Sequence, residues 1–141
     1  MEYQKNIEFG DKMKNNRKKL GKQNLEKGRR FENKVRKDLE SRGWIVSRWQ
    51  NNVEFVEYEG ATVGNLIPAR QGKFRKTSTG FPDFIIFKPT YNQEVWGVEC
   101  KVNGYLTKEE KEKAIFYLEN RIFKKFIIAM KKNKKIVYKT F

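Results

Sequence analysis

Two short segments near the middle of the chain, residues 81–87 and 95–102, constrain its fold more than any other feature. The first is apolar apart from Asp83, which is typical of a largely buried strand, and Pro82 is tolerated because it stands at the start. The second is rich in β-branched and aromatic residues and alternates with the period of two that a strand requires. A short turn separates them. The pattern therefore predicts two strands that can pair inside a sheet.

Helices are predicted on both sides of these strands, over residues 29–41 and from 107 to about 120. In the first, apolar residues recur every four positions, and these are Phe31, Val35 and Leu39. The second opens with Thr107 and Glu110, which have the spacing of a capping box.

Further strands are predicted at residues 44–49, 126–130 and 136–138, and residues 53–58 form another short strand or one arm of a hairpin. Residues 60–79 are long and weakly patterned. The order of helix, strands, helix and strand predicts an α/β fold in which a mixed central sheet is flanked by α-helices.

The chain is predicted to divide into a basic N-terminal arm, residues 1–27, and one domain, residues 28–141. The arm is polar and has few apolar positions, so we expect it to be flexible or a frayed helix. Two interpretations stay open for it: a solubilising tail, or an arm that binds nucleic acid. The domain is long enough to bury a hydrophobic core.

Net charge indicates the class of partner. The chain has 32 Lys and Arg against 17 Asp and Glu, a formal net charge of +15. Such a field favours a polyanion. Nucleic acid is expected rather than a membrane surface, because no basic helix has a broad apolar face. The longest apolar run, residues 126–130, is too short to cross a bilayer.

The N-terminus shows no secretory signal, and Cys100 is the single cysteine, so no internal disulfide can form. We therefore expect a cytoplasmic protein, in the host cytoplasm if the chain is viral. Histidine is absent, which excludes His-dependent nucleophilic triads and His-containing zinc sites, and no phosphate-binding P-loop occurs. Hydrolysis by this chain would have to use carboxylates, lysine and a hard metal ion.

Strand geometry places such groups together. Gly97, Glu99 and Lys101 share one face of their strand, and Asp83 can converge with Glu99 if the two strands pair. Two carboxylates and a carbonyl suit Mg²⁺ or Mn²⁺, an ion that can activate water on a phosphodiester. The alternative is a surface ion pair between Glu99 and Lys101 beside a turn aspartate.

The string Gly80-Phe81-Pro82-Asp83, fifteen residues and then Glu99-Cys100-Lys101 resembles the motif of the PD-(D/E)XK nuclease superfamily. Residues 28–32 and 43–48 resemble the opening of archaeal Holliday-junction resolvases and VRR-type nucleases. The resemblance spans residues 28–130. It implies a restriction-endonuclease-like core with the motif on two adjacent strands.

The resemblance also implies residue roles. Asp83 and Glu99 would bind the metal with the backbone carbonyl of Cys100, and Lys101 would serve the nucleophilic water. Glu32 would act at the metal site, although a partly exposed glutamate bonded to Arg36 explains it equally well. VRR-type relatives often carry a glutamine where Glu110 stands, and a capping box explains Glu110 without any chemistry.

The leading hypothesis is a divalent-metal-dependent DNA endonuclease for recombination or repair, and its most specific version is a resolvase of branched DNA. That version implies a homodimer, because a junction needs two symmetric cuts. The residues expected to contact duplex or branched DNA are Arg29, Arg30, Arg48, Arg70, Lys73, Arg75, Lys76, Ser78 and Thr79. A non-catalytic basic module that binds nucleic acid is the alternative, and a structural protein that docks on an acidic partner is a third.

Overall fold

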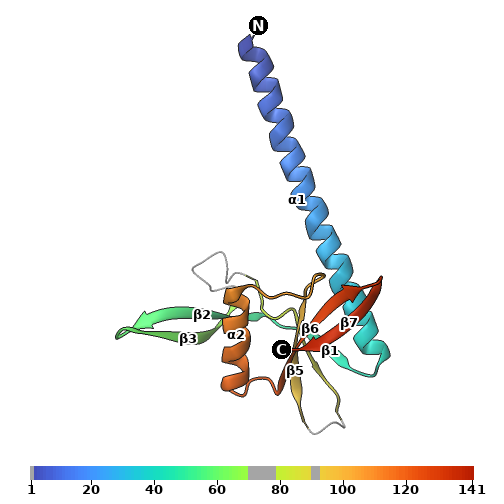
Figure 1. Cartoon of the computed structure of the whole chain (residues 1–141), viewed down its shortest axis with the longest axis vertical. Helices are drawn as coiled ribbons and strands as arrows, with labels where there is room; N and C mark the ends of the chain where they lie inside the picture. The colour runs from blue at the N-terminus through green and yellow to red at the C-terminus, as the bar shows by residue number, and fades with distance from the viewer. Residues whose placement is uncertain (1, 70–78, 90–92) are drawn as a thin grey trace. The chain divides into compact units, whose positions relative to one another are not determined.

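The computed structural model describes residues 2–69, 79–89 and 93–141, with side chains from residue 11 onward (Figure 1). Its contacts divide the chain into two units, Met1–Lys34 and Val35–Phe141. The elements are α1 (Glu2–Ser41), β1 (Ile45–Arg48), β2 (Asn51–Tyr58), β3 (Ala61–Pro68), β4 (Phe84–Phe87), β5 (Val95–Cys100), α2 (Lys108–Glu119), β6 (Lys125–Lys132) and β7 (Lys135–Thr140).

The first unit consists of the N-terminal part of α1, which is helical from Glu2 onward. The predicted arm therefore adopts the helical form of the two that were expected, and its side chains from residue 11 to 30 are exposed. The predicted apolar stripe further along α1 is buried, since Phe31, Val35 and Leu39 are at most 6% exposed. The domain boundary at residue 27 stays a prediction.

The second unit is built on a five-stranded sheet in the order β1-β4-β5-β6-β7 (Figure 1). Strands β5 and β6 are parallel, and every other neighbouring pair in this sheet is antiparallel. Helix α2 connects the two parallel strands, as a parallel pair requires a crossover. The predicted mixed sheet with helices is confirmed.

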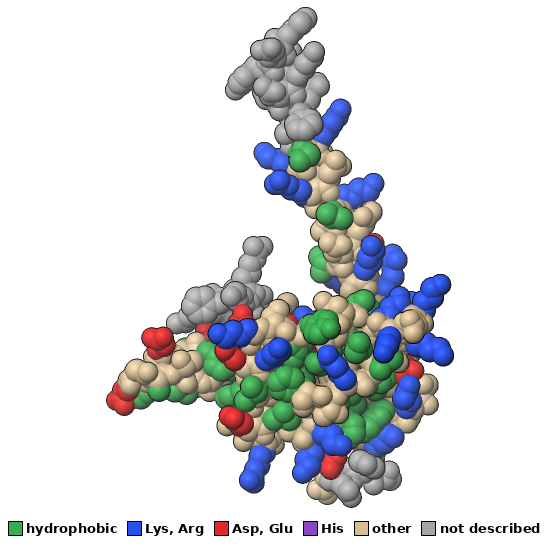
Figure 2. Space-filling view, viewed as in Figure 1, with side chains coloured by type: hydrophobic (Ala, Val, Ile, Leu, Met, Phe, Trp, Pro, Cys, Tyr) green, Lys and Arg blue, Asp and Glu red, His purple; other side chains and the backbone are tan. Residues whose placement is uncertain are grey.

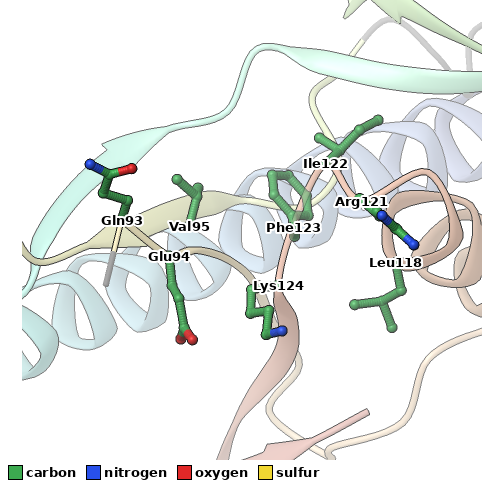
Figure 3. A pocket seen from close by; sticks show the side chains of 8 residues that line it. All are labelled: Gln93, Glu94, Val95, Leu118, Arg121, Ile122, Phe123 and Lys124. Atoms are coloured by element: carbon green, nitrogen blue, oxygen red, sulfur yellow. The ribbon is translucent and has the colours of Figure 1, made fainter. Parts of the chain in front are cut away.

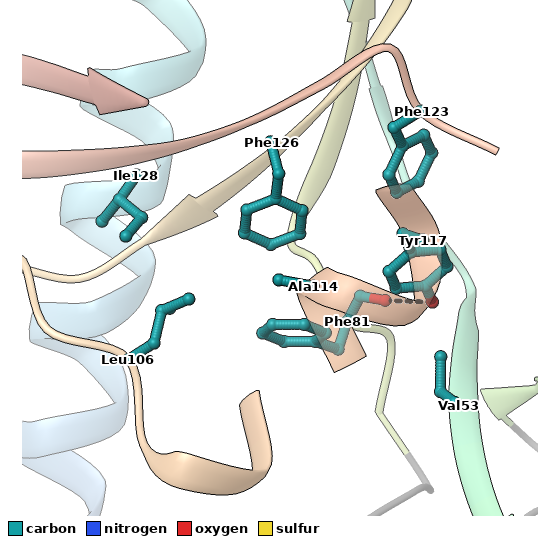
Figure 4. Packing of buried hydrophobic residues seen from close by; sticks show 8 residues of the cluster. All are labelled: Val53, Phe81, Leu106, Ala114, Tyr117, Phe123, Phe126 and Ile128. Carbon is teal, nitrogen blue, oxygen red and sulfur yellow. Dashed lines mark hydrogen bonds between the residues drawn. The ribbon is translucent and has the colours of Figure 1, made fainter. Parts of the chain in front are cut away.

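Both faces of the sheet are covered. Phe84 pairs with Val98 on one face, where the Arg36 guanidinium of α1 lies 5.2 Å from the Phe84 ring centroid. The other face packs against α2 in an apolar cluster (Figure 4), whose buried members are Val53, Phe81, Leu106, Ala114, Tyr117, Phe123, Phe126 and Ile128. Because both faces are buried, β4 is apolar along its whole length, which is the feature that predicted it.

Residues 51–68 form a separate two-stranded hairpin of β2 and β3 (Figure 1). The prediction of a hairpin arm at residues 53–58 is confirmed, but β3 was not predicted. Its sequence alternates weakly because the strand is largely exposed. Gly64 stands in its middle, where a Cβ atom would lie 2.7 Å from the Phe116 ring. The turn at Glu59 and Gly60 has positive φ at both positions, which suits a two-residue hairpin loop.

Candidate active site

The structure brings Asp83 and Glu99 together. Strand β4 pairs with β5 so that Phe84 faces Val98, and one step further this register sets Asp83 opposite Glu99. The two carboxyl groups are close enough to interact, since Asp83 contributes to the raised pKa of Glu99. The register thus sets the two residues opposite each other, and their convergence on one cation stays a prediction.

Glu99 occupies an unfavourable position for an anion. Its side chain is 6% exposed, and its Oε2 atom is buried with no hydrogen-bond partner. Burial raises the pKa of Glu99 well above its usual range, the charges of Asp83 and Glu110 raise it further, and Lys101 opposes the shift. A buried carboxylate beside a second one is costly unless a cation or a proton compensates it.

Asp83 is oriented by the backbone of β5. Its Oδ2 accepts a 2.8 Å hydrogen bond from the Cys100 N–H group. An extended residue directs its N–H and C=O groups toward the same neighbouring strand. The Cys100 carbonyl therefore faces the same strand edge as Asp83, on the side where a third oxygen ligand is predicted.

Lys101 is held by α2. Its Nζ atom lies 2.7 Å from Glu110 Oε2, and the other carboxylate oxygen of Glu110 accepts from the Thr107 N–H group at 2.9 Å. The Thr107 hydroxyl accepts from the Glu110 N–H group at 3.2 Å, which completes the predicted capping box. The capping role of Glu110 is therefore confirmed, and its ion pair with Lys101 was not predicted.

The charge state of Glu110 follows from these contacts. Burial raises the pKa of Glu110, but the hydrogen bonds from Lys101 and Thr107 lower it more, so the net shift is downward. Glu110 is thus an anion at neutral pH, and it holds the Lys101 ammonium beside the two carboxylates.

Tyr117 is a supporting residue that the sequence analysis missed. It is fully buried, its hydroxyl donates a 2.6 Å hydrogen bond to the Phe81 carbonyl and it accepts one from the Trp49 indole at 3.1 Å. Burial raises the pKa of Tyr117, and the charge of Glu99 raises it further, so the hydroxyl remains a donor. Glu110 and Tyr117 are seven residues apart on one helix face, a spacing that could have revealed both.

Lys113 is a second residue that the sequence analysis did not single out. Its side chain is almost completely buried between α2 and the segment before β4. The ammonium lies 5.8 Å from the centroid of the Phe81 ring and 3.7 Å from Glu109 Oε1. A buried lysine is held here by an aromatic face and a carboxylate on its own helix.

The other predicted site residues are described in turn. Glu32, Arg29 and Arg30 belong to the first unit, so their predicted roles stay predictions. Arg48 stacks over the Phe84 ring at 5.7 Å, on the sheet face opposite Glu99. Thr79 is exposed, and its carbonyl accepts from the Asn52 side chain at 2.6 Å. Four basic residues and one serine lie outside the described residues: Arg70, Lys73, Arg75, Lys76 and Ser78.

A pocket of about 640 Å³ lies near the opposite end of β5 (Figure 3). Val95, Leu118 and Phe123 line it, together with polar side chains such as Arg121. Val95 precedes Glu99 by four residues, about 13 Å along a strand. This pocket therefore contains none of the predicted site residues.

Within the described ranges, no cluster of three or more Asp, Glu, His or Cys side chains has the arrangement of a metal-ligand set. A metal at this site would depend on two carboxylates and main-chain oxygen. No helix in the described part of the chain has the length and hydropathy needed to cross a membrane. No family model, no curated protein and no solved structure matches the chain.

Proposed function

We propose that this chain is a divalent-metal-dependent DNA endonuclease that hydrolyses phosphodiester bonds. The observation that carries the proposal is the buried Glu99 beside the partly buried Asp83, since Glu99 Oε2 has no hydrogen-bond partner. Such a pair is unfavourable in isolation and is favoured once a cation binds. The adjacent strands β4 and β5, with α2 after them, support the restriction-endonuclease-like core that the PD-(D/E)XK resemblance implies.

The residues present fit Mg²⁺, or Mn²⁺ in its place. Asp83 and Glu99 would supply carboxylate oxygens, and the Cys100 carbonyl would supply a main-chain oxygen from the strand edge that faces Asp83. A site with only a few protein ligands suits Mg²⁺, because this ion keeps several waters and binds substrate phosphate. When bound, the ion would activate water and stabilise negative charge on the phosphate.

The protein's own groups would position the reactants. The Cys100 N–H group fixes the orientation of Asp83, and Tyr117 ties the chain just before Asp83 to the helix by its bond to the Phe81 carbonyl. Lys101, held by Glu110, would orient the attacking water and offset charge on the phosphate oxygens. Each contact limits movement of a group that must be placed within about 0.5 Å.

DNA is the proposed substrate because the net charge of +15 favours a polyanion. Lys and Arg side chains are spread over the visible face of the second unit, and acidic side chains show at the end of the β2–β3 hairpin and at scattered places elsewhere on it (Figure 2). Resolution of branched DNA by a homodimer is the most specific version of the proposal. The alternative is a basic module that binds nucleic acid without cutting it.

The test is nicking of labelled four-way-junction and linear duplex DNA with Mg²⁺, with Mn²⁺ and with a chelator. Wild type is compared with Asp83→Ala, Glu99→Gln and Lys101→Met. Matched controls are Glu112→Gln and Lys111→Met, which remove the same charges from exposed positions of α2. We expect metal-dependent cleavage that falls at least about 100-fold in the three site variants and stays within about twofold in the controls.

DNA binding is measured in parallel in the presence of chelator. Retained binding with lost cleavage would support the nuclease, and a preference for the junction would support the resolvase version. Binding without cleavage under either metal, unaffected by any of the three substitutions, would overturn the proposal in favour of the non-catalytic module.

A further inference from the structure

A pair of tryptophans lies on the face of the sheet opposite Glu99. Trp96 precedes Glu99 by three residues in β5, so their side chains point to opposite faces. The ring centroids of Trp96 and Trp44 are 4.7 Å apart and the planes are inclined by 45°. Both side chains are only half-buried, so two aromatic rings are partly accessible to solvent.

A lysine ammonium group lies over each ring of this pair. The Lys88 ammonium lies 4.5 Å from the centroid of Trp44, and the Lys125 ammonium lies 4.7 Å from the centroid of Trp96. A lysine side chain is flexible and its contact with an exposed ring is worth only about 0.5–1 kcal/mol. The ring faces are therefore covered by groups that a planar ligand can displace.

A pocket of about 190 Å³ adjoins the two tryptophans. Leu39 and Ile86 line it with apolar surface, and Arg42, Tyr138 and Lys139 supply polar and cationic groups. We call the two tryptophans and this pocket the far-face site. Its combination of aromatic rings, apolar surface and cations suits a planar, anionic ligand.

The carboxylates at the far-face site already have partners. Asp38 Oδ2 accepts from the Tyr138 hydroxyl at 2.6 Å and pairs with Arg42 at 3.1 Å. Glu94 Oε2 accepts from the Trp96 indole at 3.0 Å. Four basic side chains outnumber these two carboxylates at the site: Lys88, Lys125, Arg42 and Lys139. The local charge is therefore positive.

We propose that the far-face site binds an unpaired segment of single-stranded nucleic acid. A base would stack on Trp44 or Trp96, and the displaced lysine ammonium would pair with the adjacent phosphate. Stacking explains the aromatic rings and phosphate contact explains the cations, whereas a duplex hides its base faces and offers only phosphates. The proposal is independent of the candidate active site, because the two lie on opposite faces of the sheet.

The experiment compares binding of a fluorescein-labelled 15-nucleotide oligothymidine with binding of a blunt 15-base-pair duplex, both in chelator so that cleavage plays no part. Wild type is compared with Trp44→Leu and with the double substitution Lys88→Gln/Lys125→Gln. The matched control is Lys108→Gln/Lys111→Gln, which removes the same charge from exposed positions of α2. Ultraviolet crosslinking of wild type to an oligonucleotide containing 5-iodouracil identifies the residues in contact.

We expect Trp44→Leu to weaken oligothymidine binding roughly 10-fold and duplex binding less than twofold. The Lys88/Lys125 variant should lose more single-strand affinity than its control, and crosslinks should map to Trp44 or Trp96. Equal losses on both DNAs, or crosslinks only elsewhere, would overturn the proposal. The crosslink needs no variant, so misfolding of Trp44→Leu cannot obscure the result. Single-strand binding that survives in Glu99→Gln would separate this site from the proposed nuclease.

Discussion

Lys101 Nζ lies 2.7 Å from Glu110 Oε2, so the lysine of the motif at the end of β5 is held by the first turn of α2. Glu110 also closes the capping box with Thr107. The Glu110 carboxylate therefore stabilises the start of α2 and also holds the Lys101 ammonium beside Asp83 and Glu99. The two roles of Glu110 can be separated by substitution.

We expect Glu110→Gln to slow DNA cleavage on the order of 10-fold, while the free energy of unfolding changes by less than about 1 kcal/mol. Glutamine can still accept the Thr107 N–H bond of a capping box, but it cannot form the charged pair with Lys101. Single-turnover cleavage rates and thermal unfolding measure the two effects. An unchanged cleavage rate would show that the ion pair does not position Lys101 for the reaction.

Thr107→Ala is the complementary change. It removes the side-chain acceptor at the helix start, so we expect a loss of about 1 kcal/mol of stability. The Lys101–Glu110 pair is kept, because it does not involve the Thr107 hydroxyl. Cleavage at a temperature well below the midpoint of unfolding should stay within about twofold of wild type, and a larger loss would contradict the separation of roles.

A second prediction concerns the pH dependence of stability in the metal-free protein. The folded-state pKa of Glu99 is raised above its value in the unfolded chain, mainly by burial. The stability associated with Glu99 is therefore fully present below about pH 4.3, the ordinary value, and is lost as the pH rises through the folded-state pKa. Glu99→Gln does not titrate, so its stability relative to wild type should increase across that range.

Thermal unfolding in chelator between pH 4 and 9 measures this effect. At pH 8 we expect Glu99→Gln to unfold about 4 °C or more above wild type, the shift that roughly 1 kcal/mol produces in a chain of this size. Addition of Mg²⁺ should stabilise wild type and leave the variant unchanged. The exposed Glu112→Gln provides the control, and a pH-independent difference for Glu99→Gln would contradict the assignment of the effect to its titration.

Asp83 provides a third prediction, which depends on its bond to the Cys100 N–H group. Asp83→Asn and Asp83→Ala both remove the charge, and both should abolish metal-dependent cleavage. Only asparagine keeps an oxygen that can accept the N–H bond. We therefore expect the alanine variant to be about 1–3 kcal/mol less stable than the asparagine variant, measured by denaturant unfolding. Equal stabilities would show that the bond contributes nothing.

The sequence predicted that Asp83 and Glu99 could converge if their two strands pair, because side chains along a strand alternate between the two faces. The antiparallel register that sets them opposite each other came from the structure. The start of α2 was also predictable, because a capping box is a local spacing of residues in the sequence. The ion pair between Lys101 and Glu110 was not predictable, because it depends on how α2 packs on the sheet. Strand β3 was missed because it is largely exposed, and exposed strands carry little hydrophobic alternation.

Some contacts were outside the reach of sequence patterns altogether. The two hydrogen bonds of the Tyr117 hydroxyl join residues 36 and 68 positions away, Phe81 and Trp49. No local periodicity indicates such partners, which depend on tertiary packing. The tryptophan pair of the far-face site is similar, because Trp44 and Trp96 come from separate segments that only the assembled sheet brings together.

Gly97 shares a strand face with Glu99 and has no side chain, and the structure shows what fills the space above it. A Cβ atom at Gly97 would lie 2.8 Å from the Phe123 ring and 3.1 Å from Pro82 Cγ. The space is therefore part of the core and supports the segment that carries Asp83. The glycine serves close packing rather than access of a ligand to the strand.

This assignment yields a fourth prediction. Gly97→Ala should destabilise the protein by about 1–3 kcal/mol, because the Phe123 ring and Pro82 would have to move. Gly21→Ala is a suitable control, since a Cβ atom there meets nothing within 4 Å and alanine favours a helix. Denaturant unfolding measures both variants. If Gly97→Ala were neutral while cleavage fell, the space would belong to the substrate; loss of stability with cleavage kept at low temperature would place it in the core.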